Sequence, residues 1–183
     1  MGQLNFAANN FIIPNIVYAF NNASLTFCPL ELFDSISWAT VNIINKVAGT
    51  RTVTKTFSIS IGLYSLNGSS LSLANSIFGS QTHQYSGNKG GYLSLTSASA
   101  TQNISPGTWW LGLLISSTAQ STNLTGNLVG QNANLSAANA FPGGFIGGAM
   151  TASTNALPGS IATSDLDITG QDAFTQPIII LTA

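Results

Sequence analysis

A strict alternation of residue types at 57–63 constrains the fold of this chain more than any other feature of its sequence. Apolar side chains occupy every second position, and serine or glycine lies between them. This period of two is typical of a β-strand with one face on a core and the other toward water, and it does not fit helical spacing. Asn67-Gly68 then supplies a dipeptide that tolerates positive φ at the centre of a tight turn, and the alternation resumes at Leu71. The sequence predicts a β-hairpin here.

A second apolar segment, TWWLGLLIS at 108–116, is the expected neighbour of this hairpin. A short run that is apolar at nearly every position, opened here by the Pro106-Gly107 turn, is typical of a strand buried on both faces. We expect the odd-numbered residues from Trp109 to Ile115 on one face and the even-numbered residues on the other. The pattern therefore predicts a central strand beside 57–63.

The rest of the chain offers more short strands and no segment with helical periodicity. The candidate strands are 16–20, 24–28 (which Pro29 is expected to stop), 36–47, 92–95 and 178–181, whereas 76–91 has the polar, glycine-rich composition of a loop. We predict an all-β fold, an antiparallel β-sandwich of the jelly-roll type. A length of 183 residues suits one domain over 1–183. Within it we expect 1–22 to be a peripheral arm or edge strand and 118–163 to be a long, loop-rich, packed segment.

Charge is almost absent from this composition. Charged residues make up 5% of the chain and hydrophobic residues 44%, and four basic and five acidic side chains give a net charge of −1. So few basic groups cannot neutralise several phosphates or hold an anionic membrane surface, so nucleic acid is not an expected partner. Copies of the chain repel one another only weakly, and association between them is not opposed.

The sequence also bears on the compartment and on the single cysteine. The first twenty residues lack the basic region of a signal peptide, and no stretch approaches the roughly 18 apolar residues of a membrane span. We therefore expect synthesis in the cytoplasm without a signal peptide and no membrane insertion. Cys28 cannot form an internal disulfide, and beside Phe27 and Leu30 it is interpreted as a small buried apolar residue.

Few residues could support catalysis. His83 is the only histidine, so a site of several imidazoles is impossible and a Ser-His-Asp triad would have to use it. Glu31 and Asp34 could form the carboxylate pair of a glycosidase, but their spacing of three residues near Pro29 favours a pair that flanks a turn. We expect no enzymatic activity and no cofactor.

Binding candidates come from the polar and aromatic residues. His83 and Tyr85 lie in the polar 79–91 segment, which could present a contact surface. Tyr64 and Tyr92 could stack on sugar rings through their aromatic faces. Plain packing in the core is the alternative for these tyrosines.

The stretch 165–170, DLDITG, reproduces the opening of a calcium-binding loop. Position twelve of that loop is Gln176, which cannot supply a bidentate carboxylate. The same residues would also fit a strand with the aspartates outward, and this structural interpretation is favoured over a calcium site built from Asp165, Asp167 and Asp172.

The 118–163 segment is the expected place for subunit contacts. No charged residue occurs between Lys89 and Asp165, and glycine, alanine, asparagine, serine and threonine dominate. The apolar residues Phe141, Phe145 and Met150 are the anchors expected to contact neighbouring subunits.

Three stretches together carry a resemblance to a known group of proteins: FSISIGLYSLNGSSLSLANS, PGTWWLGLLIS and SDLDITGQDAFTQPIIIL. In style and order they resemble C-terminal domains of tail and fibre-type structural proteins of bacteriophages, over residues 33–183. The resemblance implies a virion-associated β-sandwich that forms a homo-oligomer, with a trimer favoured, and it supplies no catalytic residues. It implies either a receptor-binding module that recognises host-surface glycan or, alternatively, a structural or decoration protein that contacts other virion subunits.

Overall fold

The structure is a computed structural model, and the residues it describes form an almost entirely β architecture. These residues are 16–21, 23–38, 40–45, 54–86, 91–96, 102–117, 125–134, 148–152, 154–167, 173–177 and 179–182. Their elements are β1 (Ile16–Asn21), β2 (Ser24–Leu32), β3 (Ile36–Trp38), β4 (Thr40–Asn45), β5 (Thr54–Asn67), β6 (Ser70–Ser86), β7 (Gly91–Thr96), β8 (Gln102–Ile104), β9 (Gly107–Ser117), β10 (Thr125–Asn134), β11 (Gly148–Thr151), β12 (Ser160–Ala162), the 3₁₀ helix η3 (Thr163–Asp165), β13 (Ala173–Pro177) and β14 (Ile179–Thr182). The predicted all-β class is confirmed.

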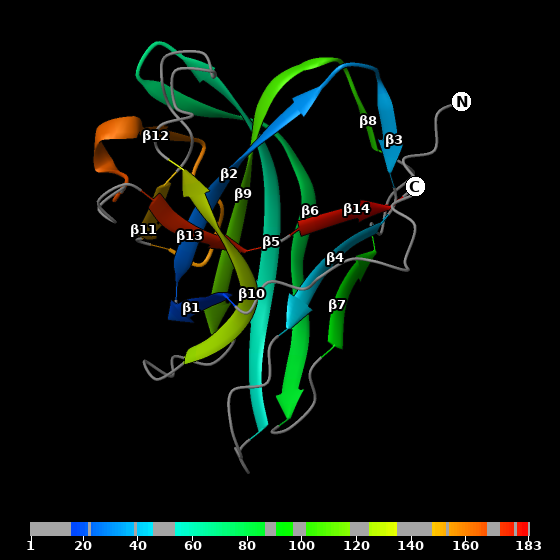
Figure 1. Cartoon of the computed structure of the whole chain (residues 1–183), viewed down its shortest axis with the longest axis vertical. Coiled ribbons are helices and arrows are strands. Elements are labelled where there is room, and N and C mark those ends of the chain that lie inside the picture. The colour runs from blue at the N-terminus through cyan, green and yellow to red at the C-terminus, as the bar shows by residue number, and fades with distance from the viewer. Residues whose placement is uncertain are drawn as a thin grey trace.

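The described strands pair antiparallel and form three sheets (Figure 1). One six-stranded sheet has the order β11-β2-β9-β5-β6-β12. Another has the order β1-β10-β4-β14, with β13 on β10 and β7 on β4, and β3 pairs with β8 in a small third sheet. β1 contacts β9, and β13 contacts β2. In Figure 1, the sheet that contains β10 and β13 passes in front of β2 and β9. The strand expected near 16–20 is β1, at one end of its sheet.

The predicted hairpin is β5 and β6, but its turn lies one residue later than expected. Asn67 pairs with Ser70, so the central residues are Gly68 and Ser69. Gly68 has φ +62°, and neither Asn67 nor Ser69 has a positive φ. Glycine at the first central position is the pattern of a type II′ turn, whose twist matches that of the two strands.

The hairpin is also much longer than the sequence indicated. β6 continues to Ser86, so the loop predicted at 76–91 is wrong for 76–86, and 87–90 lie outside the described residues. The β5–β6 register shifts at three places, and β6 has 17 residues against 14 in β5. These bulges take up the extra residues of a polar segment whose backbone groups still find partners on β5.

β9 is the predicted central strand, with β2 on one side and β5 on the other. Every residue from Trp110 to Ser116 is buried. The register also confirms the two predicted faces, since Leu113 lies opposite Ile61 and Gly112 lies opposite Gly62.

The expectation that one face of the 57–63 strand meets water is wrong. Ser58 and Ser60 are 7% and 6% exposed, and Ser116, opposite Ser58, is 3% exposed. Small residues on this face therefore mark a second buried surface rather than a wet one. Over residues 58–64, β5 is covered on both sides, as β9 is over 110–116.

Candidate functional site

The segment 148–167, which we call the cap, crosses one face of the sheet that contains β2, β9 and β5. It begins as β11 on the edge of β2 and reaches the opposite edge as β12 on β6. η3 then leads to Asp167, which pairs with Ala149 through N–O contacts of 2.7 and 3.1 Å. The cap thus joins the two edges of the sheet and closes on its own first strand.

Backbone hydrogen bonds hold the cap at three points. The Ala152 N–H donates to the Ala23 carbonyl at 2.8 Å, and the Leu73 N–H donates to the Gly159 carbonyl at 2.9 Å. Thr163 donates both its N–H, at 2.8 Å, and its hydroxyl, at 3.1 Å, to the carbonyl of Ser69. The partners of the cap are Ala23, directly before β2, and residues of the β5–β6 hairpin, so the hairpin also positions the cap.

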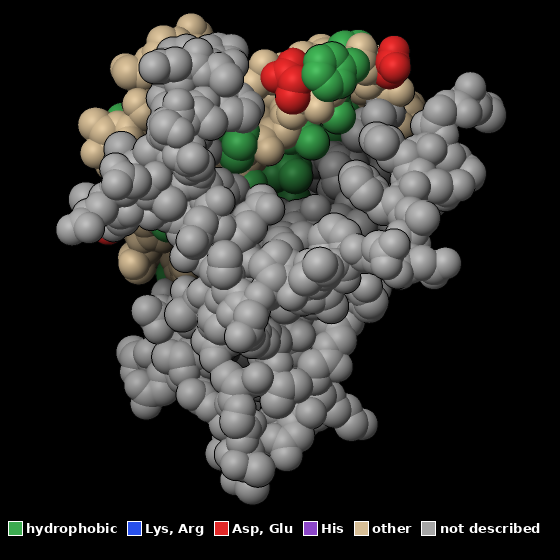
Figure 2. All heavy atoms as spheres, in the orientation of Figure 1, with side chains coloured by type: hydrophobic (Ala, Val, Ile, Leu, Met, Phe, Trp, Pro, Cys, Tyr) green, Lys and Arg blue, Asp and Glu red, His purple; other side chains and the backbone are tan. Residues whose placement is uncertain are grey.

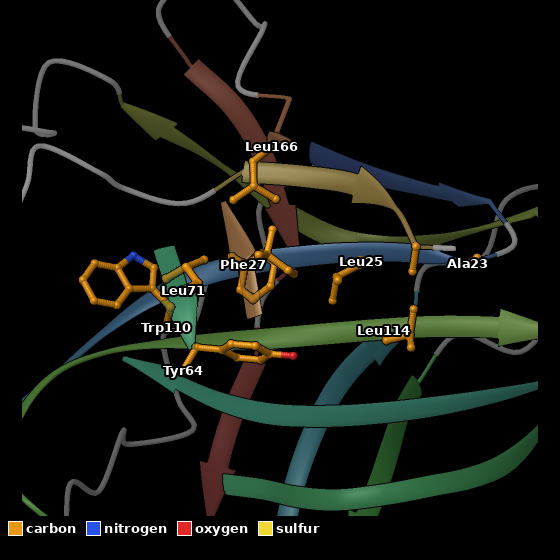
Figure 3. Packing of buried hydrophobic residues seen from close by; sticks show 10 residues of the cluster. Ala23, Leu25, Phe27, Tyr64, Leu71, Trp110, Leu114 and Leu166 are labelled. Atoms are coloured by element: carbon orange, nitrogen blue, oxygen red, sulfur yellow. The ribbon is translucent and has the colours of Figure 1, made fainter. Parts of the chain in front are cut away.

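Between the cap and the sheet lies a core cluster that includes residues of β2, β5, β9 and the cap (Figure 3). Its buried members are Ala23, Leu25, Phe27, Tyr64, Leu71, Trp110, Leu114, Ala152, Ile161 and Leu166. Met150, Leu157, Leu66 and Leu73 pack against it while partly exposed. The cap is therefore secured by apolar burial as well as by hydrogen bonds.

Tyr64 is the side chain that links the sheet to the cap. It is 0% exposed, its ring meets Phe27 edge to face at a centroid distance of 4.9 Å, and its hydroxyl donates to the Pro158 carbonyl at 2.9 Å. The prediction that Tyr64 could stack on a sugar is therefore wrong, because no face of the ring is open. Packing, the alternative interpretation, holds for this residue.

A pocket of about 170 Å³ opens where the cap passes between β11 and β12. Several of its lining residues are apolar, Thr154 and Ser160 carry hydroxyls, and Asp165 carries a carboxylate. The Thr154 hydroxyl also donates to the Ala156 carbonyl at 3.3 Å. The lining residues are Met150, Ala152, Thr154, Ala156, Pro158, Ser160, Ile161 and Asp165. We call this the cap pocket.

The cap pocket combines the two surfaces that a small hydroxylated ring needs. Apolar atoms of Met150, Pro158 and Ile161 can cover the C–H face of such a ring. The Thr154 and Ser160 hydroxyls and the Asp165 carboxylate can exchange hydrogen bonds with its hydroxyl groups. The volume is well below the roughly 300–1,000 Å³ of sites for drug-sized ligands, so the pocket suits one small unit. The carboxylate disfavours an anionic ligand.

Sequence reasoning did not find the cap pocket. Its lining residues form no motif, and all of them except Asp165 lie in the 118–163 segment that was expected to be loop-rich. That segment also contains β10, β11 and β12. Met150, predicted as a subunit contact, is half-buried against the core and lines the pocket, while Phe141 and Phe145 lie outside the described residues. The abrupt end of the charge-free stretch at Asp165 was the only available signal.

The other predicted binding residues do not come together at this pocket. His83 and Tyr85 lie in β6, opposite Phe57 and Lys55, rather than in a loop. Tyr92 lies in β7, opposite Ile44. The structure describes the backbone positions of these three residues but not their side chains.

The acidic residues follow the structural interpretation where they are described. Leu166 is buried, and Asp165 and Asp167 on either side of it are exposed, as expected for outward aspartates, although Asp165 ends a 3₁₀ helix rather than a strand. Within the described ranges no three His, Cys, Asp or Glu side chains are grouped for a metal ion, and Asp172 lies outside those ranges. Glu31 is the last residue but one of β2, and Asp34 lies in the turn that follows the strand.

Cys28 is buried on β2, and burial raises the pKa of its thiol from 9.0 to about 12. Because the pKa is higher in the folded chain, its contribution to stability is complete below pH 9 and is lost as the pH rises from about 9 toward 12. A difference of this size corresponds to a loss of up to about 4 kcal/mol at the upper end. Burial also raises the pKa of Tyr64, which acts in the same direction at higher pH.

We expect chemical denaturation at pH 8, 9, 10 and 11 to show this decline and Cys28→Ala to flatten its lower part. A thiol reagent at pH 8 should react at least a hundredfold faster with the unfolded chain than with the folded chain, because only the thiolate attacks. Equal rates would contradict the burial of Cys28, and an unchanged pH slope in Cys28→Ala would contradict the linkage.

Within the described residues, no helix is both long and apolar enough to span a bilayer. Comparisons of the chain with protein-family models, with curated proteins and with solved structures give no match.

Proposed function

We propose that this chain is a virion-associated domain of a bacteriophage tail or fibre, an antiparallel β-sandwich of the jelly-roll type, that binds a neutral host-surface glycan without catalysing a reaction. The observation that carries the proposal is the cap pocket, whose lining includes apolar residues, two hydroxyl-bearing residues and one aspartate. The resemblance of 33–183 to tail and fibre-type domains supports the location. The near absence of charge in the sequence favours a neutral ligand and association between copies.

The geometry supports binding better than hydrolysis. The only carboxylate in the pocket lining is Asp165, whereas glycoside hydrolysis ordinarily uses two carboxylates on either side of the scissile bond. Glu31 accepts a hydrogen bond from the Thr108 hydroxyl at 2.5 Å. This pair lies near the end of β2 and the start of β9, and neither residue lines the pocket. A lone carboxylate among hydroxyls serves as a hydrogen-bond acceptor for a sugar.

The test is a glycan array followed by calorimetry on the sugar that binds. We expect Asp165→Asn to weaken binding about tenfold or more, since a hydrogen bond to a charged group contributes about 1.5–3 kcal/mol. Asp167→Asn is the matched control, because Asp167 is exposed two residues away and does not line the pocket. It should bind as the wild type does.

Two outcomes would contradict the proposal. If the folded domain bound no sugar and no cells of susceptible hosts, a structural or decoration role on the virion would replace it. If both aspartate variants bound like the wild type, the glycan site would lie elsewhere on the molecule.

A further inference from the structure

The cap pocket changes from apolar at its base to polar at its mouth. Ala152 and Ile161 are the buried members of its lining, with 8% and 6% of their surfaces exposed, and both belong to the core cluster. The exposed members of the lining are Thr154, Ala156, Ser160 and Asp165. A ligand that fills the pocket therefore enters with an apolar group foremost and keeps its polar atoms near the mouth.

Several hydrogen-bond donors along this lining already have partners within the chain. The Ala152 N–H donates to the Ala23 carbonyl. The Thr154 hydroxyl donates to the Ala156 carbonyl at 3.3 Å and accepts from the Ala156 N–H at 3.4 Å. Pro158 has no N–H to offer. A ligand therefore gains most from this lining if it brings a donor of its own.

The acceptor for such a donor is the carboxylate of Asp165. It makes no hydrogen bond or ion pair with another residue of the part of the chain that the structure describes. An ionised carboxylate only accepts hydrogen bonds, whereas the hydroxyl of Ser160, on the same lining, can either donate or accept. The mouth of the pocket thus offers one charged acceptor and one hydroxyl that can donate.

The surroundings of Asp165 are acidic as well. Asp167, two residues away, is also exposed, and the charged side chains that Figure 2 shows among the described residues are acidic. Repulsion between like charges opposes a sugar that carries a carboxylate or a sulfate. A sugar with a free ammonium group would pair with the carboxylate but would leave the apolar base of the pocket without a partner.

We propose that the cap pocket recognises the acetamido group of an N-acetylhexosamine unit, an inference that rests on the proposed glycan-binding function. The methyl group lies against Ala152 and Ile161 at the base. The amide N–H donates to the Asp165 carboxylate, and the amide carbonyl accepts from the Ser160 hydroxyl. A plain hexose lacks the methyl group, and a deoxyhexose has a methyl group without an adjacent N–H.

The test uses NMR titration of the full chain with methyl glycosides of glucose and of galactose that differ only at the carbon next to the anomeric centre. The N-acetyl derivative is compared with the O-acetyl derivative, which lacks only the N–H, and with the N-formyl derivative, which lacks only the methyl group. The O-acetyl sugar should bind about tenfold or more weakly, because it leaves the carboxylate unpaired. The N-formyl sugar should bind about fourfold more weakly, the effect of one buried CH₂ group. Among the ligand protons, those of the acetamido methyl should receive the largest saturation transfer from the protein.

Asp165→Ala removes the acceptor and should abolish the preference for the N-acetyl over the O-acetyl sugar. Asp167→Ala is the matched control and should keep the preference, and unchanged thermal unfolding confirms that both variants are folded. Equal binding of the two sugars by the wild type, or an unchanged preference in Asp165→Ala, would overturn the inference.

Two further outcomes separate this inference from the proposed function. If a plain hexose or a deoxyhexose bound more tightly than the N-acetyl sugars, the acetamido inference would be wrong and the glycan site would stand. If the folded chain bound no sugar on the glycan array, the proposed function would fail and the inference with it.

Discussion

Replacing Tyr64 with alanine is expected to lower the free energy of unfolding by about 3–5 kcal/mol, the range for removal of a fully buried aromatic side chain. The ring is 0% exposed, and it packs edge to face on Phe27. Its loss would leave a cavity under the cap and an unpartnered Pro158 carbonyl. The cap would then be held by its backbone hydrogen bonds and by the rest of the core.

Tyr64→Phe separates the two losses. It keeps the ring and removes only the hydrogen bond to Pro158, so it should cost about 0.5–1.5 kcal/mol. Thr151→Ala, at an exposed position of β11, is the control and should stay within about 0.5 kcal/mol of the wild type. Urea denaturation followed by circular dichroism measures all three. Equal costs for the alanine and phenylalanine variants would show that the ring does not support the core.

Gly112→Val is expected to destabilise the protein by about 1–3 kcal/mol or more, although valine is ordinarily the better residue in a strand. A Cβ at this position would lie 2.7 Å from Cε2 of Tyr64 and 2.9 Å from Cε1 of Phe27. Both rings are buried and in mutual contact, so neither can move aside. Overpacking therefore outweighs the gain in β-propensity.

Gly159→Ala is the matched glycine control, since a Cβ there meets no atom within 4 Å. It should be close to neutral in the same denaturation experiment. The double variant Gly112→Val with Tyr64→Ala should cost less than the sum of the two single variants, because the missing ring leaves room for the valine. If the losses of unfolding free energy were additive, they would contradict the interpretation that position 112 needs glycine because the Tyr64 ring occupies the space of a larger side chain.

The strands that carry Tyr64 and Gly112 show how much of the fold can be predicted from the sequence. Alternation at 57–63 and the apolar run at 108–116 are local patterns, and they predicted both strands, their faces and their pairing. They could not show that the face of β5 with small residues is buried as well. A glycine or a serine gives the same sequence pattern whether it faces water or packs against an aromatic side chain of a neighbouring strand.

Less of the candidate site than of the fold could be predicted from the sequence. His83, Tyr85, Tyr64 and Tyr92 were chosen by residue type, yet the first two lie in β6 and Tyr64 lies in the core. The cap pocket is lined by Met150, Pro158 and Ile161 together with alanine, threonine, serine and one aspartate, and these residues form no sequence motif. Only the path of the cap from β11 to β12 brings them together.

The sequence by itself determined the all-β class, the hairpin, the central strand and the buried character of Cys28, because these follow from periodicity and residue type over a few neighbouring positions. The tertiary structure decided that polar residues 76–86 form a strand, that Tyr64 is covered, and that 148–167 crosses the sheet. These outcomes depend on pairing and burial between segments far apart in the chain, such as the pairing of Gly148 with Phe27 and the hydrogen bond from Tyr64 to Pro158. Such pairing satisfies backbone groups whatever side chains they carry, so composition could not have shown it.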